Sequence, residues 1–456
     1  MRLPRPEPGF FKNLMILAVP MLLQNLVTFL VGFADNVMVG SLGEIAISGV
    51  YLGNQLQSFM QTIIIGVDSA MLILAAQYWG RRDTATIKKI FVIAMRIALS
   101  LALVFNIAAV AAPRAVLRLF IQDEAVIAEG MRYLKYVCWS YMIFASSQLL
   151  ITSMRSVESV KVGMYASFIS LGVNVVLNYI LIFGKLGAPK MGVAGAALAT
   201  LISRIVEFSV AFIYVFFMDQ KLKMRPADLL HTNSTLVRDF FKYGAPVIAG
   251  WIVWAINSAA QSAIVGSLGA GATSAVSLYG QSHQMLSVAL SAVSGATGII
   301  TGKLVGAGEV ERVKNHARVV QLMYLCIGIV GCIFINIIKD AFIGLYALTD
   351  ETVVMARQFL TIYSFYFIGT CYQGHSLGSL VKAGGDTKFV FINDTIFVFG
   401  FVLPTALICR YFNAPAWLVF ACLRSDEILK CPVAFIKINR FKWIKNLTRS
   451  KEELAK

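Results

Sequence analysis

The chain has 456 residues, of which 58% are hydrophobic and only 14% are charged, with a formal net charge of +16. An ordinary soluble protein carries about 25% charged residues, and a soluble chain with this composition would expose large apolar patches. The composition therefore excludes a soluble enzyme, a disordered chain and a nucleic-acid-binding protein. The basic residues lie between apolar stretches, which indicates a polytopic membrane protein.

Twelve apolar stretches are long enough to cross the hydrocarbon core as helices, which takes about 20 residues each. A membrane barrel would instead show strands of about ten residues with alternating hydrophobicity. We therefore predict an all-α polytopic membrane protein with twelve transmembrane helices. The predicted spans are 13–36, 46–76, 90–112, 130–153, 163–184, 192–217, 243–265, 272–301, 317–338, 354–381, 389–409 and 415–438.

The loop charges predict the orientation of the chain. An even number of spans puts both termini on one side, and the loops of that side hold 27 Lys and Arg against nine on the other. The positive-inside rule then makes both termini cytoplasmic. We expect a multi-pass protein of the cell membrane, specifically a bacterial inner membrane. The basic tail, with Phe441 and Trp443, is expected to lie on the anionic lipids of the inner leaflet.

The sequence repeats itself. Pro246 follows Pro20 by 226 positions, and the second copy of Val-Gly-Ser-Leu-Gly, at 265–269, follows the first, at 39–43, by the same interval. Each copy holds six spans, so both insert in the same direction, as two six-helix bundles related by a pseudo-two-fold axis along the membrane normal. The predicted divisions are an N-terminal bundle at 1–217, a cytoplasmic linker at 218–242, a C-terminal bundle at 243–438 and a basic cytoplasmic tail at 439–456.

No enzyme motif is found. The sequence contains neither H-E-x-x-H nor G-x-x-x-x-G-K-[ST], and its seven Cys include no C-x-x-C pair. We expect neither catalysis nor a cofactor, and no nucleic-acid partner. Without an ATP site, work done by this chain must draw on an ion gradient.

Several motifs resemble those of the MATE (multidrug and toxic compound extrusion) family. They are the run GFADNVMVGSLG at 32–43, its copy after Pro246, and Val173-Asn174 with Asn178. The carboxylates of the N-terminal half make the chain most similar to the DinF-like branch. The resemblance implies a V-shaped pair of six-helix bundles that exports amphipathic and cationic drugs, driven by H⁺ or Na⁺.

The chain departs from the family pattern at three positions. Another branch carries a glutamate and an aspartate where this chain has Trp254 and Cys371, and several DinF-like relatives carry a second aspartate where it has Asn178. The resemblance therefore implies no coupling site in the C-terminal half. It makes Asp35 the main coupling carboxylate.

The intramembrane polar residues form stripes. Asp35 lies five residues before Gly40, roughly 7–8 Å below the outer boundary, and Asn174 and Asn178 share one face of another helix. With Thr200 they form the predicted proton or cation coupling site. A Na⁺ ion at Asp35, Asn174 and Asn178 is the alternative, since these side chains supply oxygen ligands.

A second set of polar residues is predicted to line a substrate cavity. Asp68 completes the polar stripe that Asn54, Gln57 and Gln61 form on the second predicted helix. It either faces the cavity or is a hydrogen-bonded polar residue near the inner end of that helix. The set comprises Gln24, Thr28, Asn54, Gln57, Gln61 and Asp68.

Pro20 interrupts the first helix, where proline removes one hydrogen bond. It is predicted to be a hinge, with a static kink as the alternative.

The pairs Arg204–Glu207, Arg424–Glu427 and Asp426–Lys430 have the spacing of intrahelical ion pairs. No role is assigned to His283, His375 or Asp394.

Together these features predict a monomeric secondary antiporter that exports amphipathic or cationic compounds in exchange for protons at Asp35. Two alternatives remain: the same fold coupled to Na⁺, and a flippase for lipid-linked precursors. The flippase would favour a strongly basic central cavity.

The topology can be tested by labelling. In a variant without native cysteines, Asn233→Cys should not react with an impermeant thiol reagent added to intact cells, and should react after the membrane is opened. Ready labelling from outside would contradict the predicted orientation.

Overall fold

The computed structural model describes residues 6–230, 232–346, 348–450 and 452–453. These residues form helices and connecting turns and contain no strand, which confirms the all-α prediction. Each of the twelve predicted spans coincides with one helix or with a run of consecutive helical segments. The basic residues Arg2, Arg5, Lys451 and Lys456, which enter the loop charges above, lie outside the described residues.

The chain divides into two compact units. The N-unit comprises Val19–Gly244 and the tail from Arg449, and the C-unit comprises the residues before Val19 and Ala245–Thr448. Two long helices change unit along their length: α1 (Phe10–Gly40) does so after Ala18, and α9 (Ser234–Gly266) after Gly244. Each change lies within two residues of a proline inside the helix, Pro20 in α1 and Pro246 in α9.

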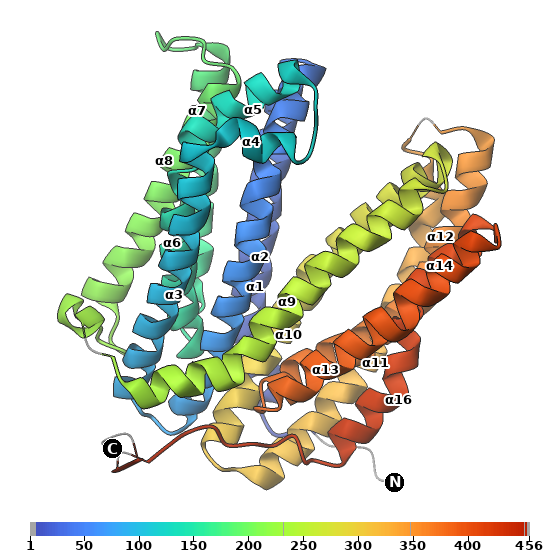
Figure 1. Ribbon diagram of the computed structural model, residues 1–456. Coiled ribbons are helices and arrows are strands. Elements are labelled where there is room, and N and C mark those ends of the chain that lie inside the picture. The colour runs from blue at the N-terminus through green and yellow to red at the C-terminus, as the bar shows by residue number, and fades with distance from the viewer. Residues whose placement is uncertain (1–5, 231, 347, 451, 454–456) are drawn as a thin grey trace. The chain divides into compact units, whose positions relative to one another are not determined.

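In its described residues the N-unit contains seven further α-helices between α1 and α9, and a π-helical turn that follows α8. Small residues allow close packing: a side chain at Gly195 would collide with the backbone of Leu181, and one at Gly49 with Glu129. Helices α5 and α6 are bent by 52° relative to each other and are long and apolar enough to cross a membrane only as a pair. The elements, shown in Figure 1, are α2 (Glu44–Gly80), α3 (Thr84–Ala111), α4 (Pro113–Arg118), α5 (Glu124–Val137), α6 (Ser140–Ser156), α7 (Lys161–Phe183), α8 (Val193–Ile213) and η1 (Tyr214–Met218).

Local signals set the helix ends. Gly43 has a φ of 110°, which favours glycine, and this residue turns the chain from α1 into α2. Gly269 does the same before the second repeat's helix, at a φ of 102°. Asp83 caps α3 by accepting a hydrogen bond from the backbone N–H of Thr86 at 3.1 Å. The repeated Val-Gly-Ser-Leu-Gly motif is therefore a repeated turn.

The segment between the two repeats folds onto the N-unit. Lys221 donates hydrogen bonds to the backbone of Val157 at 2.7 Å, and Lys88 pairs with Asp228 at 2.8 Å. Burial raises the pKa of Asp228, but hydrogen bonds from Lys88 and the backbone of Arg225 outweigh it and hold this pKa below its usual value. Residues 226–230 form a 3₁₀ turn, and α9 begins at Ser234, so 234–242 are helical although the sequence predicts a linker there.

The C-unit packs its helices around an aromatic core. Phe359 stacks on Phe420 at 4.4 Å, and Tyr279 meets Tyr363 edge-on at 4.8 Å. Its elements are α10 (Ala270–Gly306), α11 (Val310–Ile343), α12 (Asp350–Gly369), the π-helical η3 (Thr370–His375) and η4 (Leu377–Lys382), α13 (Thr387–Phe397), the π-helical η5 (Val398–Val402), α14 (Leu403–Tyr411), α15 (Ala416–Leu423) and α16 (Asp426–Asn439).

The tail after α16 is held by protein contacts. Trp443 is fully buried in the C-unit core and donates to the backbone oxygen of Ile438 at 2.8 Å. The expectation that this tryptophan lies on lipid is therefore wrong, because its ring is enclosed by protein. Further along, Arg449 belongs to the N-unit and forms two hydrogen bonds with the carboxylate of Asp239.

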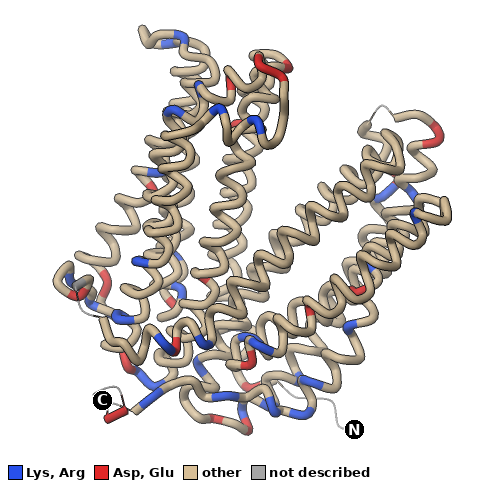
Figure 2. The backbone as a smooth tube through the Cα atoms, in the orientation of Figure 1, with Lys and Arg blue, Asp and Glu red and all other residues tan. Residues whose placement is uncertain are grey.

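The charge distribution suits a membrane. Most acidic and basic positions lie near helix ends, and few interrupt the middle stretches (Figure 2). Among the described residues, nine helices are long and apolar enough to cross a membrane, and the α5–α6 pair makes a tenth. The other two predicted spans, 354–381 and 415–438, are not among the helices that meet this criterion.

Candidate functional site

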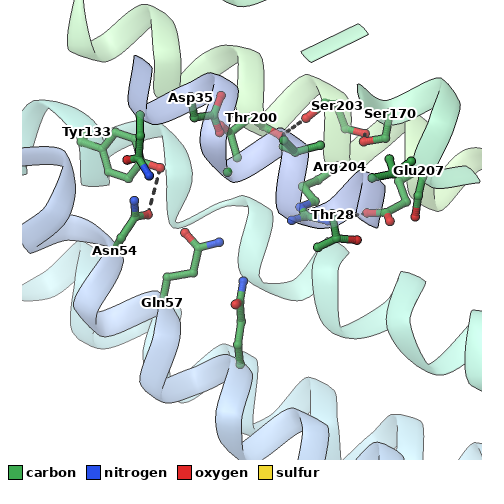
Figure 3. Close-up of a pocket in the computed structure, with 16 residues that line it drawn as sticks. Thr28, Asp35, Asn54, Gln57, Tyr133, Ser170, Thr200, Ser203, Arg204 and Glu207 are labelled. Atoms are coloured by element: carbon green, nitrogen blue, oxygen red, sulfur yellow. Dashed lines mark hydrogen bonds and ion pairs between the residues drawn. The ribbon is translucent and has the colours of Figure 1, made fainter. Parts of the chain in front are cut away.

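A cavity of about 240 Å³ lies inside the N-unit. It is enclosed by α1, α2, α5, α7 and α8, and its lining is mainly polar (Figure 3). The lining residues are Val27, Thr28, Val31, Gly32, Asp35, Asn36, Asn54, Gln57, Gln61, Tyr133, Ser167, Ser170, Thr200, Ser203, Arg204 and Glu207.

Asp35 connects this cavity to two buried amides. Its Oδ1 accepts a hydrogen bond from Nδ2 of Asn178, and the same nitrogen donates to Oδ1 of Asn174 at 3.1 Å. Both asparagines are fully buried, so they lie behind Asp35 and not on the cavity wall. Their spacing of one helical turn on α7 produces this alignment.

The amide pair has unused hydrogen-bonding capacity. Asn174 Nδ2 and Asn178 Oδ1 are buried and have no partner among the described residues. An amide offers both donors and acceptors, so the pair can serve an ionised carboxylate, which only accepts, and a protonated one, which also donates. The site can therefore accommodate both protonation states of Asp35.

Arg204 and Glu207 form the intrahelical ion pair that their spacing predicts, at 2.6 Å. The sequence did not place them in the cavity. Arg204 lies one turn beyond Thr200 on α8, and that spacing was the available signal. Tyr133 donates a hydrogen bond to Asn54 at 3.0 Å and also lines the cavity. No pattern of polar residues in the helix that carries Tyr133 predicted this position.

The charged lining residues nearly balance. Among the described residues the lining holds one guanidinium and two carboxylates. Because Arg204 and Glu207 pair with each other, the net charge of the lining depends on Asp35. It is −1 when Asp35 is ionised and zero when Asp35 is protonated.

The predicted cavity residues divide into two groups. Thr28, Asn54, Gln57 and Gln61 line the cavity, whereas Gln24 and Asp68 are not among its lining residues. Gln24 is held away because its Oε1 accepts from Arg155 at 2.8 Å. Asp68 lies further along α2 and is only 7% exposed.

Pro20 lies inside a helix that runs unbroken from Phe10 to Gly40. Proline cannot donate the hydrogen bond that would reach the carbonyl of Ile16, one turn earlier. The missing bond falls where α1 changes from the C-unit to the N-unit.

The C-unit differs from one expectation. Arg424 does not pair with Glu427, because its guanidinium lies over the ring of Tyr279 at 4.7 Å. Glu427 instead accepts from Gln373 at 2.8 Å.

The other charged and histidine side chains that the sequence analysis named in the C-unit have local partners. Lys430 forms the predicted pair with Asp426 at 2.9 Å and also pairs with Asp394 at 3.0 Å. His283 interacts with the hydroxyl of Tyr363 at 3.1 Å, and the ring of His375 lies 5.9 Å from that of Tyr324.

Comparison with known proteins places this arrangement in a family. The MatE family model matches residues 20–180 and 246–408, once in each repeat. The chain is 23% identical to the probable multidrug resistance protein YoeA of Bacillus subtilis, over 90% of this chain and 89% of that protein. It is 22% identical to the probable multidrug resistance protein NorM of Thermotoga maritima, over 99% and 97%.

Solved structures share the fold. A mutant of the Vibrio cholerae MATE transporter VcmN has a TM-score of 0.85 at 17% identity, covering 96% of this chain and 98% of that one. A MOP superfamily transporter from Pyrococcus furiosus has a TM-score of 0.84 at 17% identity, covering 96% and 97%. With the family model matched along both repeats, this chain belongs to the MatE family, whose members are membrane transporters and not enzymes.

Proposed function

We propose that this protein is a multidrug efflux antiporter that exports amphipathic cations in exchange for protons bound at Asp35. One observation carries the proposal: among the described lining residues, Asp35 is the carboxylate that forms no direct ion pair, since Arg204 pairs with Glu207. A proton and a cationic drug both neutralise this carboxylate. Binding of either one therefore weakens binding of the other, which is the requirement for exchange.

Burial makes this competition strong. Charges interact more strongly where the effective dielectric constant is low, and a lone charge buried without a partner is costly. An ionised Asp35 therefore attracts a cation into the cavity, and a protonated Asp35 no longer attracts it.

The amides behind Asp35 connect protonation to conformation. Asn178 donates to the ionised carboxylate, and the unpaired oxygen of Asn178 is an acceptor for a protonated one. Rotation of these groups alters the contact between α1 and α7. Pro20 weakens α1 at the position where it changes unit, so α1 can bend there when the contact changes.

The energy required is modest. A proton that binds one conformation about 2.7 kcal/mol more tightly shifts a two-state equilibrium about a hundredfold. The conformation that binds the proton more tightly gains population as pH falls. Protons arriving from outside then favour the bent state, which narrows the cavity and releases the drug.

The cavity also bears on the substrate. Ligand pockets usually measure about 300–1,000 Å³, so 240 Å³ suits the cationic group of an amphipathic compound better than a whole large drug. A flippase for anionic lipid-linked precursors would favour a basic cavity, but Arg204 is the one basic residue among the described lining residues. The names of the relatives, multidrug resistance proteins, support the same substrate class.

The coupling ion is tested in proteoliposomes. Ethidium transport should follow an imposed proton gradient and should not respond to an imposed Na⁺ gradient at constant pH. Transport driven by Na⁺ alone would overturn proton coupling and leave the antiporter proposal in place.

Asp35→Asn should abolish proton-driven transport while the protein still reaches the membrane. The amide fixes the cavity in its neutral state, so neither proton binding nor release can occur. Ethidium transport in proteoliposomes measures this. Glu311→Gln is the matched control, because Glu311 is 85% exposed at its side chain and lies in the C-unit. Wild-type transport by the Asp35 variant would contradict the coupling role.

Asn174→Ala and Asn178→Ala should each impair transport without lowering membrane expression, since each removes part of the hydrogen-bond exchange behind Asp35. Asn178→Asp adds a titratable group and should alter the pH dependence of transport. The pH profile of ethidium efflux measures both effects. If all three variants keep the wild-type rate and profile, these amides serve packing alone.

Pro20→Ala should slow turnover and leave proton binding intact, because it restores the hydrogen bond to Ile16 and stiffens α1. Stopped-flow measurement of drug release after a pH jump gives the rate. Pro246→Ala makes the same change in α9, which carries no equivalent of Asp35, and is the matched comparison. An unchanged release rate in Pro20→Ala would identify a static kink.

A further inference from the structure

A second buried carboxylate of the N-unit, Asp68, lies on the inner side of the cavity. Asn54, Gln57 and Gln61 line the cavity from one face of α2. Asp68 is seven residues beyond Gln61, so it lies on the same face of the helix, about 10 Å further from the outer end. The polar stripe of α2 thus continues past the cavity to a group that can bind a proton.

The side chain of Asp68 is enclosed but incompletely bonded. It is 7% exposed, and its Oδ1 is buried and has no hydrogen-bond partner among the described residues. Arg155 of α6 is the charged group that interacts with it electrostatically, and the two do not form a direct ion pair. A carboxylate with a free, buried oxygen and only a distant counter-charge is unusual for a structural residue.

Arg155 links this carboxylate to the cavity. It donates to Gln24 of α1 at 2.8 Å, and it interacts electrostatically both with Asp68 and with Glu207 of the cavity lining. Its Nε is buried without a partner. Arg155 lies one residue before the end of α6, which the predicted topology places at the cytoplasmic side.

We propose that Asp68 is a second proton-binding carboxylate, which receives the proton released from Asp35 into the cavity and passes it to the cytoplasm. In this step the O–H bond at Asp35 breaks and an O–H bond forms at Oδ1 of Asp68. Asp35 regains its negative charge, and Asp68 loses its own. The inference rests on the proposed proton coupling and adds an inner site to it.

Arg155 is the positioning residue of this site. When Asp68 is ionised, Arg155 stabilises the charge and keeps the carboxylate ready to accept. When Asp68 is protonated, Arg155 keeps its hydrogen bond to Gln24 and its electrostatic interaction with Glu207. The alternative is that Asp68 is only a permanent counter-ion for Arg155.

A charge-balanced pair of variants separates these roles. Asp68→Asn should lower proton-driven ethidium transport in proteoliposomes about tenfold or more, as expected for loss of a proton-transferring group. The double variant Asp68→Asn with Arg155→Gln restores the charge balance but not the proton site, so its transport should stay low. Recovery of wild-type transport in the double variant would overturn the proposal. Glu311→Gln is again the control.

Infrared difference spectra of the purified protein provide a readout independent of transport. Among the carboxylic acid C=O bands that the wild type gains on acidification, Asp35→Asn should remove one and Asp68→Asn another. Asp68→Glu should retain a second, shifted band and part of the transport, which shows that the site tolerates a carboxylate. An Asp68→Asn spectrum identical to that of the wild type would overturn the inner site.

The two levels of the proposal fail in different ways. If Asp35→Asn leaves transport and both bands unchanged, the proposed coupling at Asp35 is wrong whatever Asp68 does. If Asp35→Asn abolishes transport and Asp68→Asn matches the wild type in rate and spectrum, only the inner site is wrong.

Discussion

A buried cavity tolerates little unbalanced charge, and the proposed exchange of drug for proton depends on this electrostatic constraint. The N-unit cavity contains a guanidinium and two carboxylates, and the Arg204–Glu207 pair leaves Asp35 as the group that decides the net charge. Unbalanced charge is costly in a low-dielectric interior, so a change of one proton there alters which ligand is favoured. The proposed competition between drug and proton follows from that balance.

The surroundings of Asp35 turn this charge change into a structural one. Two fully buried asparagines hold the carboxylate from behind and retain one free donor and one free acceptor. The helix that carries Asp35 also carries Pro20, close to the point where it passes from one compact unit to the other. A local change in hydrogen bonding therefore acts on the helix that belongs to both units.

Much of the fold was predictable because its signals are local. Apolar length gave the spans, and glycine turns such as Gly43 and Gly269 repeat with the sequence. Asp35, the carboxylate of the first helix, was also predictable because it interrupts an apolar stretch. Contacts between distant segments were not predictable. No pattern in the sequence placed Tyr133 in the cavity, and the guanidinium of Arg424 lies over an aromatic ring instead of pairing with its helical neighbour.

Two predicted cavity residues illustrate the same limit. Gln24 and Asp68 share helical faces with residues that do line the cavity, yet Gln24 accepts a hydrogen bond from Arg155, and Asp68 interacts with Arg155 electrostatically. Helical periodicity identifies a face but does not say where along that face the cavity ends. The position of Arg155, brought in by a different helix, decides this. Arg155, to which the sequence analysis assigned no role, therefore lies between the cavity and the proposed inner proton site.

The central claim is tested most directly by equilibrium binding. The affinity of purified protein for ethidium, followed by dye fluorescence, should fall as pH is lowered, by up to about tenfold per pH unit if one proton is displaced. The same titration on Asp35→Asn should give weak binding that does not depend on pH. Binding by the wild type that stays constant across pH, or a pH dependence that survives in Asp35→Asn, would contradict competition at this carboxylate.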